Sequence, residues 1–210
     1  MKLIVFILFM TSHAYSYVDF NLGYTYSIKK IDGVATDENP DPGSAQTTSD
    51  GYQVNCAWYM WEYTALELNY SSTTQRLLDD REVTTTDADG DPLTIKKQDS
   101  TVITQVSGIG IRQAFANRKA SIIPSLAIGY AQYTTSGSTK YTIDFNGTLG
   151  SFENIQDKEV FSSSYVTFTL RFRITQLIGL TLAAKTVMPE FKTKEASNNM
   201  TYSAGFSWVF

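Results

Sequence analysis

Histidine is almost absent from this sequence of 210 residues: the single example, His13, lies near the N-terminus. Imidazole is the most common general base in enzymes and a frequent ligand of zinc and iron. Its scarcity argues against hydrolases that depend on an imidazole and against imidazole-based metal sites. We therefore expect no enzyme activity, no cofactor and no metal site, and only catalysis by carboxylates alone remains as an alternative.

Cysteine and long apolar runs are also scarce. Cys56 is the only cysteine, so no disulfide can form within the chain. The longest apolar stretch after the N-terminal region, residues 177–188, is interrupted by Thr181, Lys185 and Thr186. It falls short of the roughly 20 apolar residues that a membrane helix needs. The net charge is −4 and no basic patch supports binding of nucleic acid.

One short apolar run does stand out, at the N-terminus. Lys2 is followed by eight apolar residues and then by small and polar ones. A positive start, a short apolar core and small residues near a cleavage point are typical of a secretory signal peptide. We expect a signal peptide over residues 1–16, cleaved after Ala14 or Ser16, and a mature chain over residues 17–210.

Apolar and polar residues alternate with a period of two in eight segments of the mature chain. This alternation predicts strands with one apolar and one polar face. Gly108 and Gly110 make the fourth segment the least regular, and they predict a β-bulge there. The eight predicted strands span residues 17–28, 52–61, 65–73, 101–115, 122–133, 166–174, 178–185 and 200–210.

The connections between these strands alternate in length. Those after the second, fourth and sixth strands are tight, at residues 62–64, 116–120 and 175–177, and the others are long. Transmembrane barrels alternate in this way, with short periplasmic turns and long extracellular loops. The sequence therefore predicts an all-β chain that forms an eight-stranded antiparallel up-and-down transmembrane β-barrel.

The polar face of the predicted strands carries several charged side chains. A barrel of eight strands is just wide enough inside for side chains, and buried charges are costly unless they are paired. We expect a polar network that closes the lumen, while a gated ion path through the same residues remains an alternative. These charges would also make a poor cavity for an apolar ligand, which disfavours a soluble lipid carrier. The expected network consists of Glu67, Arg112, Arg171, Arg173 and Lys185.

The long loops contain two hairpin signals, Asp89-Gly90 and Asn146-Gly147. Such pairs between strand-like runs are typical of type I′ turns. We expect the third to sixth strands to project beyond the membrane as a fin whose edge is able to pair with a partner's strand; loops that only shield the surface are the alternative. The flanking runs are residues 82–86 and 93–96 for the first turn, and 141–145 and 148–152 for the second.

The first of these turns is acidic. Asp87, Asp89 and Asp91 resemble a fragment of a calcium loop, but the glutamate and the helices of an EF-hand are missing. We interpret the segment as an acidic hairpin tip, with a weak site for a divalent cation as the alternative.

Three segments resemble a known superfamily. The C-terminal strand resembles that of outer-membrane barrels, in which terminal aromatic residues form a signal for the barrel-assembly machinery. Residues 59–70 resemble the second hairpin, and residues 129–131 the fifth strand, of the small barrels of the OmpX/Ail group and of the OmpA transmembrane domain. In this chain the aromatic signal residues are Tyr202, Phe206, Trp208 and Phe210.

The resemblance implies a monomer in the outer membrane of a bacterium, with membrane lipid and the barrel-assembly machinery as partners. No periplasmic peptidoglycan-binding domain is expected. We expect the extracellular loops to act in surface structure, adhesion or cell–cell interaction, by binding an extracellular protein or a cell-surface ligand. Two alternatives remain: a channel for small solutes or hydrophobic molecules, similar to the OmpW group, and a purely structural membrane protein.

Overall fold

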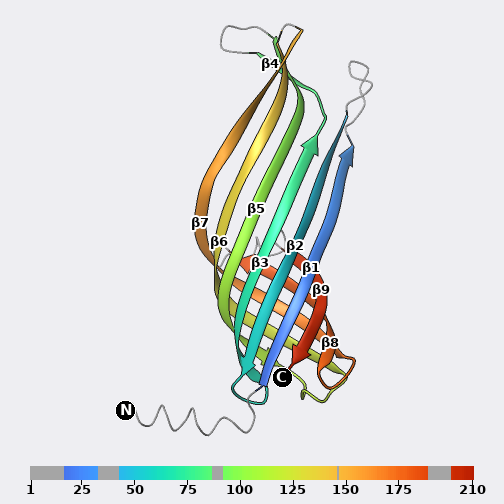
Figure 1. Ribbon diagram of the computed structural model, residues 1–210, viewed down its shortest axis with the longest axis vertical. Helices are drawn as coiled ribbons and strands as arrows, with labels where there is room; N and C mark the ends of the chain where they lie inside the picture. Colours follow the sequence, from blue (N-terminus) through green and yellow to red (C-terminus); the bar gives the residue numbers. More distant parts are fainter. Residues whose placement is uncertain (1–16, 33–42, 87–91, 146, 189–199) are drawn as a thin grey trace, which may run out of the picture.

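The protein is a closed antiparallel β-barrel with long hairpin extensions at one end (Figure 1). The computed structural model describes residues 17–32, 43–86, 92–145, 147–188 and 200–210. In these ranges no helix is long and apolar enough to cross a membrane. The strands are β1 (Tyr17–Asp32), β2 (Ser44–Tyr59), β3 (Thr64–Asp79), β4 (Val83–Thr86), β5 (Pro92–Ala114), β6 (Ile122–Phe145), β7 (Thr148–Arg173), β8 (Ile178–Met188) and β9 (Met200–Val209).

Two pairings close the sheet. β1 pairs with β9, and β3 pairs with β5. At the levels of the barrel that all eight wall strands reach, the sheet therefore has no free edge. β4 pairs only with the first residues of β5, beyond the part of β5 that pairs with β3. The predicted eight-stranded antiparallel barrel is therefore confirmed, and β4 is a short additional strand.

The two ends of the barrel differ. At one end, here called the turn end, short connections join β2 to β3, β5 to β6 and β7 to β8. The last residue, Phe210, lies at this end as well (Figure 1). At the opposite, hairpin end, β5, β6 and β7 reach 23, 24 and 26 residues, whereas β8 and β9 have 11 and 10. The three long strands consequently rise well beyond β8 and β9 (Figure 1).

Both predicted hairpins are present. Phe145 of β6 pairs with Thr148 of β7, and Gly147 adopts a φ of 81° in the turn, a conformation that favours glycine. Val83 of β4 pairs with Ile95 of β5. The long connection expected between the fifth and sixth strands is thus a hairpin, as its turn signal predicted, because its residues continue β6 and β7 up to this tight turn and project beyond the barrel.

The glycines of β5 mark a close approach of a side chain rather than a bulge. β5 pairs with β6 without interruption over residues 97–114, and the register shifts lie at the start of β5 and in the middle of the β6–β7 pairing. A Cβ on Gly110 would lie 2.5 Å from the Tyr165 hydroxyl. The bulge predicted at Gly108 and Gly110 is therefore wrong, since Gly110 leaves room for the Tyr165 ring inside the barrel.

The barrel is apolar outside and polar inside. Every wall strand exposes a large apolar side chain on its outer face, and the opposite parity carries buried polar and charged residues. Water-soluble proteins have the reverse arrangement, with charged side chains almost never fully buried. The exposed outer side chains include Leu22, Tyr52, Leu68, Ile109, Ile128, Phe168, Leu180 and Phe206.

Candidate functional site: the polar interior

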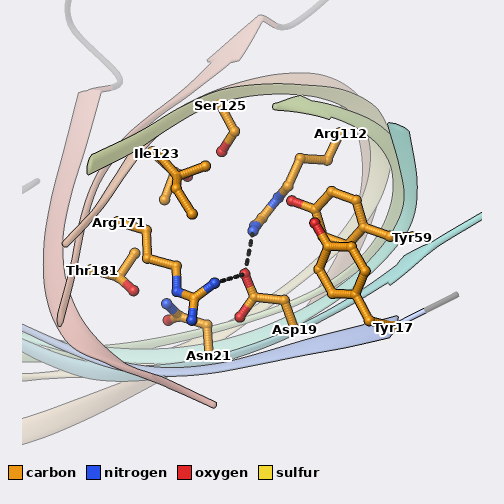
Figure 2. A pocket seen from close by; sticks show the side chains of 10 residues that line it. Tyr17, Asp19, Asn21, Tyr59, Arg112, Ile123, Ser125, Arg171 and Thr181 are labelled. Atoms are coloured by element: carbon orange, nitrogen blue, oxygen red, sulfur yellow. Dashed lines mark ion pairs between the residues drawn. The ribbon is translucent and has the colours of Figure 1, made fainter. Parts of the chain in front are cut away.

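Four charged side chains lie at the centre of the turn-end half of the lumen. Asp19 comes from β1, Glu67 from β3, Arg112 from β5 and Arg171 from β7, and all four are at most 5% exposed. Three of them are drawn in Figure 2, where both guanidinium groups point towards Asp19. Two carboxylates and two guanidinium groups balance in charge, and such pairing offsets part of the cost of removing charges from water.

Arg112 links the two carboxylates. Its Nε donates a hydrogen bond to Glu67 Oε2 at 2.5 Å, and its Nη1 lies 3.9 Å from Asp19 Oδ2. Arg171 Nη1 lies 3.9 Å from the same Asp19 oxygen, and Arg171 Nε donates to Ser207 Oγ at 2.8 Å. These contacts connect five strands of the wall across the lumen, so the cluster fixes the strands relative to one another.

Aromatic rings lie beside this cluster on the turn-end side. Tyr17 and Tyr59 stack with their ring centroids 4.2 Å apart and their planes 7° apart (Figure 2). The Arg118 guanidinium lies 5.2 Å from the Tyr17 ring centroid, and Ile123 and Val209 belong to the same apolar cluster as the two rings. The cavity left among the charged groups measures about 10 Å³, which is room for about one water molecule.

A second polar layer follows towards the hairpin end. Tyr165 is fully buried, and its hydroxyl accepts a hydrogen bond from Asn69 Nδ2 at 2.6 Å. Lys185 Nζ lies 4.8 Å from the Tyr165 ring centroid and 3.5 Å from Asn69 Oδ1. The ammonium group is thus held by a ring face and an amide oxygen, both of which attract cations.

The five charged residues predicted for the lumen fall into three positions. Glu67, Arg112 and Arg171 meet in the charged cluster, and Lys185 lies in the neighbouring layer. Arg173, the last residue of β7, is partly exposed, and none of the ion pairs among the described residues includes it.

Asp19 was missed by the sequence prediction although it is central to the charged cluster. The signal was present in the pattern, because Asp19 occupies the polar parity of the first predicted strand together with Asn21 and Gly23. Parity alone identifies which residues point inward. It does not say which of them reach one another, because that depends on pairings between strands distant in sequence.

The residues predicted to form the assembly signal lie on the outer face of β9 and just after it. Tyr202, Phe206 and Phe210 are exposed. Trp208 is partly buried, with its ring centroid 6.5 Å from that of Phe206 and 6.4 Å from that of Phe20 on β1. Aromatic side chains in such positions form the girdles of membrane barrels at the lipid interface.

Charged groups also pair near the hairpin end. Arg81 and Asp79 are 2.6 Å apart, and the hydrogen bonds from Arg81 lower the pKa of the Asp79 carboxyl. Lys96 lies 2.9 Å from Glu82, and the hydrogen bond between them raises the pKa of the lysine. Exposed pairs of this kind contribute little to stability. The predicted acidic tip, with Asp87, Asp89 and Asp91, lies outside the described residues.

A closed barrel with an apolar exterior and a charged, hydrogen-bonded interior is a transmembrane β-barrel of the bacterial outer-membrane class, because a β-sheet satisfies every backbone group in lipid only when it closes. No protein-family model matches the sequence, and no curated protein matches it. The class assignment rests on the closed wall and on its inside-out polarity.

Several solved structures have a similar form. The N-terminal β-barrel domain of Pseudomonas aeruginosa OprF is 11% identical with a TM-score of 0.49, over 93% of this chain and 98% of that one. Ail, the attachment invasion locus protein of Yersinia pestis, in complex with the heparin analogue sucrose octasulfate, is 12% identical with a TM-score of 0.45, over 93% and 99%. Neisserial surface protein A is 11% identical with a TM-score of 0.36, over 92% and 94%.

Proposed function

We propose that the protein acts at the bacterial surface, in adhesion or cell–cell interaction, through the strands that project from the hairpin end of its barrel. In this arrangement the turn end faces the periplasm and the hairpin end faces the exterior, as in transmembrane barrels generally. The outer-face aromatic residues of β9 would contact lipid and serve the assembly machinery. The charged cluster would keep the lumen closed to solutes.

The observation that carries this proposal is the unpaired outer part of β7. β7 pairs with β6 along nearly all of its length, but with β8 only from Ser164 to Arg173. Among the described strands, none pairs with the other edge of residues 148–163. Such an edge presents backbone N–H and C=O groups that a strand of another molecule can pair with.

The side chains of this edge support binding rather than simple shielding. Every residue from 148 to 162 is exposed, on both faces of the strand. Five of them are large and apolar, while charged residues interrupt the apolar positions and thereby limit non-specific pairing. The apolar members are Leu149, Phe152, Ile155, Val160 and Phe161.

Shortening the β6–β7 hairpin tests the proposal. Thr135 and Glu159 are register partners nearer the barrel, so residues 136–158, which include most of the free edge of β7, can be replaced by Asn-Gly without changing the barrel below. Attachment of bacteria that display the shortened protein to host cells, and their aggregation, should fall to the level of bacteria without the protein. Unchanged attachment and aggregation, with equal surface amounts, would reject the proposal and favour a purely structural protein.

A point substitution tests whether attachment depends on the free edge of β7 itself and not only on the presence of the hairpin. Ile155→Lys places a charge on the free edge of β7. Leu78→Lys is the control: it places a charge on β3, which pairs with a neighbouring strand on both sides at this position. We expect the first substitution to reduce attachment and the second to leave it unchanged. Equal effects of the two substitutions would argue against recognition by strand pairing.

A channel for small solutes or hydrophobic molecules is the second candidate function, and one observation favours it. The hairpin-end half of the barrel contains a cavity of about 650 Å³, whose lining includes the exposed Tyr26 and Tyr202 as well as the inward-facing Lys185. Steady conductance across a bilayer would favour this candidate over a closed lumen.

A further inference from the structure

We propose that the large cavity in the hairpin-end half of the barrel is a binding site for a small sugar acid, a polyhydroxylated molecule with one carboxylate. This function is separate from strand pairing at β7. The volume of about 650 Å³ lies within the range of small-molecule sites, about 300–1,000 Å³. None of the residues that line it also lines the small cavity of the charged cluster, so the site ends on the hairpin-end side of that cluster.

The charge of the cavity selects an anion. Among the described residues that line it, Lys185 is the only charged one. None of the ion pairs among the described residues includes Lys185, and its Nζ lies against the neutral Asn69 amide and the Tyr165 ring. Glu67, the carboxylate that attracts this lysine, is itself paired with Arg112. A carboxylate that reached this ammonium group would form a charge-assisted hydrogen bond without displacing another anion.

The walls of the cavity suit a ligand with several hydroxyl groups. β2, β3 and β5 contribute hydroxyl and amide side chains, which donate and accept hydrogen bonds. An alkyl chain in the same place would remove these groups from water without replacing their hydrogen bonds, which is unfavourable. The polar wall residues include Ser49, Gln53, Ser71, Thr73, Gln75 and Thr104.

One wall also carries an aromatic surface with an unused hydroxyl. Tyr133 and Phe161 stack with centroids 5.1 Å apart and planes 6° apart. Tyr133 is 6% exposed, packs with Val106 and Val187, and its hydroxyl has no hydrogen-bond partner among the described residues. The exposed Phe161 ring offers an apolar platform for the C–H face of a sugar, and a ligand oxygen would satisfy the Tyr133 hydroxyl.

Calorimetric titration of the folded protein in detergent micelles tests the proposal with three probes. D-glucuronate combines the carboxylate with hydroxyl groups, D-glucose lacks the carboxylate, and hexanoate lacks the hydroxyl groups. We expect saturable one-to-one binding of glucuronate. Its affinity should exceed that of glucose about tenfold or more, as expected for one hydrogen bond to a charged group, and should exceed that of hexanoate because hexanoate lacks the hydroxyl groups that bond to the walls. Absence of saturable glucuronate binding, or tighter binding of hexanoate, would overturn the proposal.

Substitutions locate the binding in the cavity. Lys185→Met should weaken glucuronate binding about tenfold or more, whereas Lys185→Arg should largely preserve it. Lys140→Met, at an exposed cation on the outer part of β6, should have no effect. Tyr133→Phe should weaken binding severalfold although Lys185 is intact. This second variant keeps the test valid if Lys185→Met does not fold. Equal affinity in Lys185→Met, Tyr133→Phe and the unmodified protein would overturn the assignment.

Discussion

Each buried charged residue in the turn-end half of the barrel lies near a residue of opposite charge. Arg112 lies between Glu67 and Asp19, and Arg171 shares Asp19. Removing one partner of a buried ion pair leaves an uncompensated charge, and this usually costs more than the pair itself contributes. The energetic role of each residue in the charged cluster therefore depends on whether its partner is still present.

Glu67→Ala should lower the free energy of unfolding by about 3–5 kcal/mol, because Arg112 loses its nearest carboxylate. Urea titration of the protein in lipid vesicles, followed by tryptophan fluorescence, measures the change. Glu82→Ala, which breaks the exposed pair with Lys96, is the control and should cost at most about 1 kcal/mol. Equal losses in the two variants would show that the charged cluster does not stabilise the barrel.

Gly129→Ala should destabilise the barrel by about 1–3 kcal/mol, as overpacking typically does. The added Cβ would clash with the backbone carbonyl oxygen of Ile109 and would lie 2.6 Å from Cζ of the buried Tyr165 ring. Gly150→Ala is the matched control on β7, because the nearest atom to its Cβ, on Ile143, would be 3.7 Å away. The same urea titration compares the two variants, and equal stability of Gly129→Ala and the control would contradict the close packing of Tyr165 and the Ile109 backbone around Gly129.

At the scale of the element, the β6–β7 hairpin depends on its turn. Gly147 has a positive φ, and its N–H donates to Asp144 Oδ1 at 2.9 Å. A side chain in the left-handed region costs roughly 1–2 kcal/mol. The hairpin is long and exposed, so such a cost is expected to act locally and not on the barrel wall.

Gly147→Val should therefore speed amide hydrogen exchange in the outer parts of β6 and β7 without changing exchange in the wall. Exchange followed by mass spectrometry resolves the two regions. Gly150→Ala again serves as the control, since it carries no positive φ. Identical exchange of the hairpin in Gly147→Val and the unmodified protein would contradict the role given to the turn.

At the scale of the whole molecule, closure of the sheet determines stability. β1 to β9 and β3 to β5 are the pairings that leave no wall strand with a free edge in the turn-end half. In lipid or detergent, opening the barrel would expose unpaired backbone groups, each at a cost of several kcal/mol.

The folded protein should consequently resist SDS at room temperature and change its electrophoretic mobility only after boiling. Gel electrophoresis of matched boiled and unboiled samples measures this. Identical migration of the two samples would contradict a closed barrel.

The purified protein should also give no steady open-channel currents in planar bilayers. The charged cluster and the stacked Tyr17 and Tyr59 rings occupy the lumen, and only about 10 Å³ remains among them. Glu67→Ala should raise ion leakage, because it loosens the cluster. Steady currents of the size given by a general porin would instead support the channel candidate.

The sequence by itself determined the properties that depend on neighbouring residues. Side chains alternate along a strand with a period of two, so parity predicted the outer apolar face and the inward position of Glu67 and Arg171. Asn146-Gly147 predicted a hairpin turn for a similarly local reason. The number of wall strands followed from counting these local patterns between the turns.

Only the tertiary structure decided what depends on closure. Pairing of β3 with β5 and of β1 with β9 brings Asp19, Arg112 and Arg171 to one level of the lumen, and no local pattern encodes that register. The lengths of β5 to β7 were underestimated, because polar residues continue a strand when a neighbour supplies its hydrogen bonds. The cavity around Lys185 likewise depends on elements that are distant in the chain, because β2, β3, β5 and β8 all contribute to its lining.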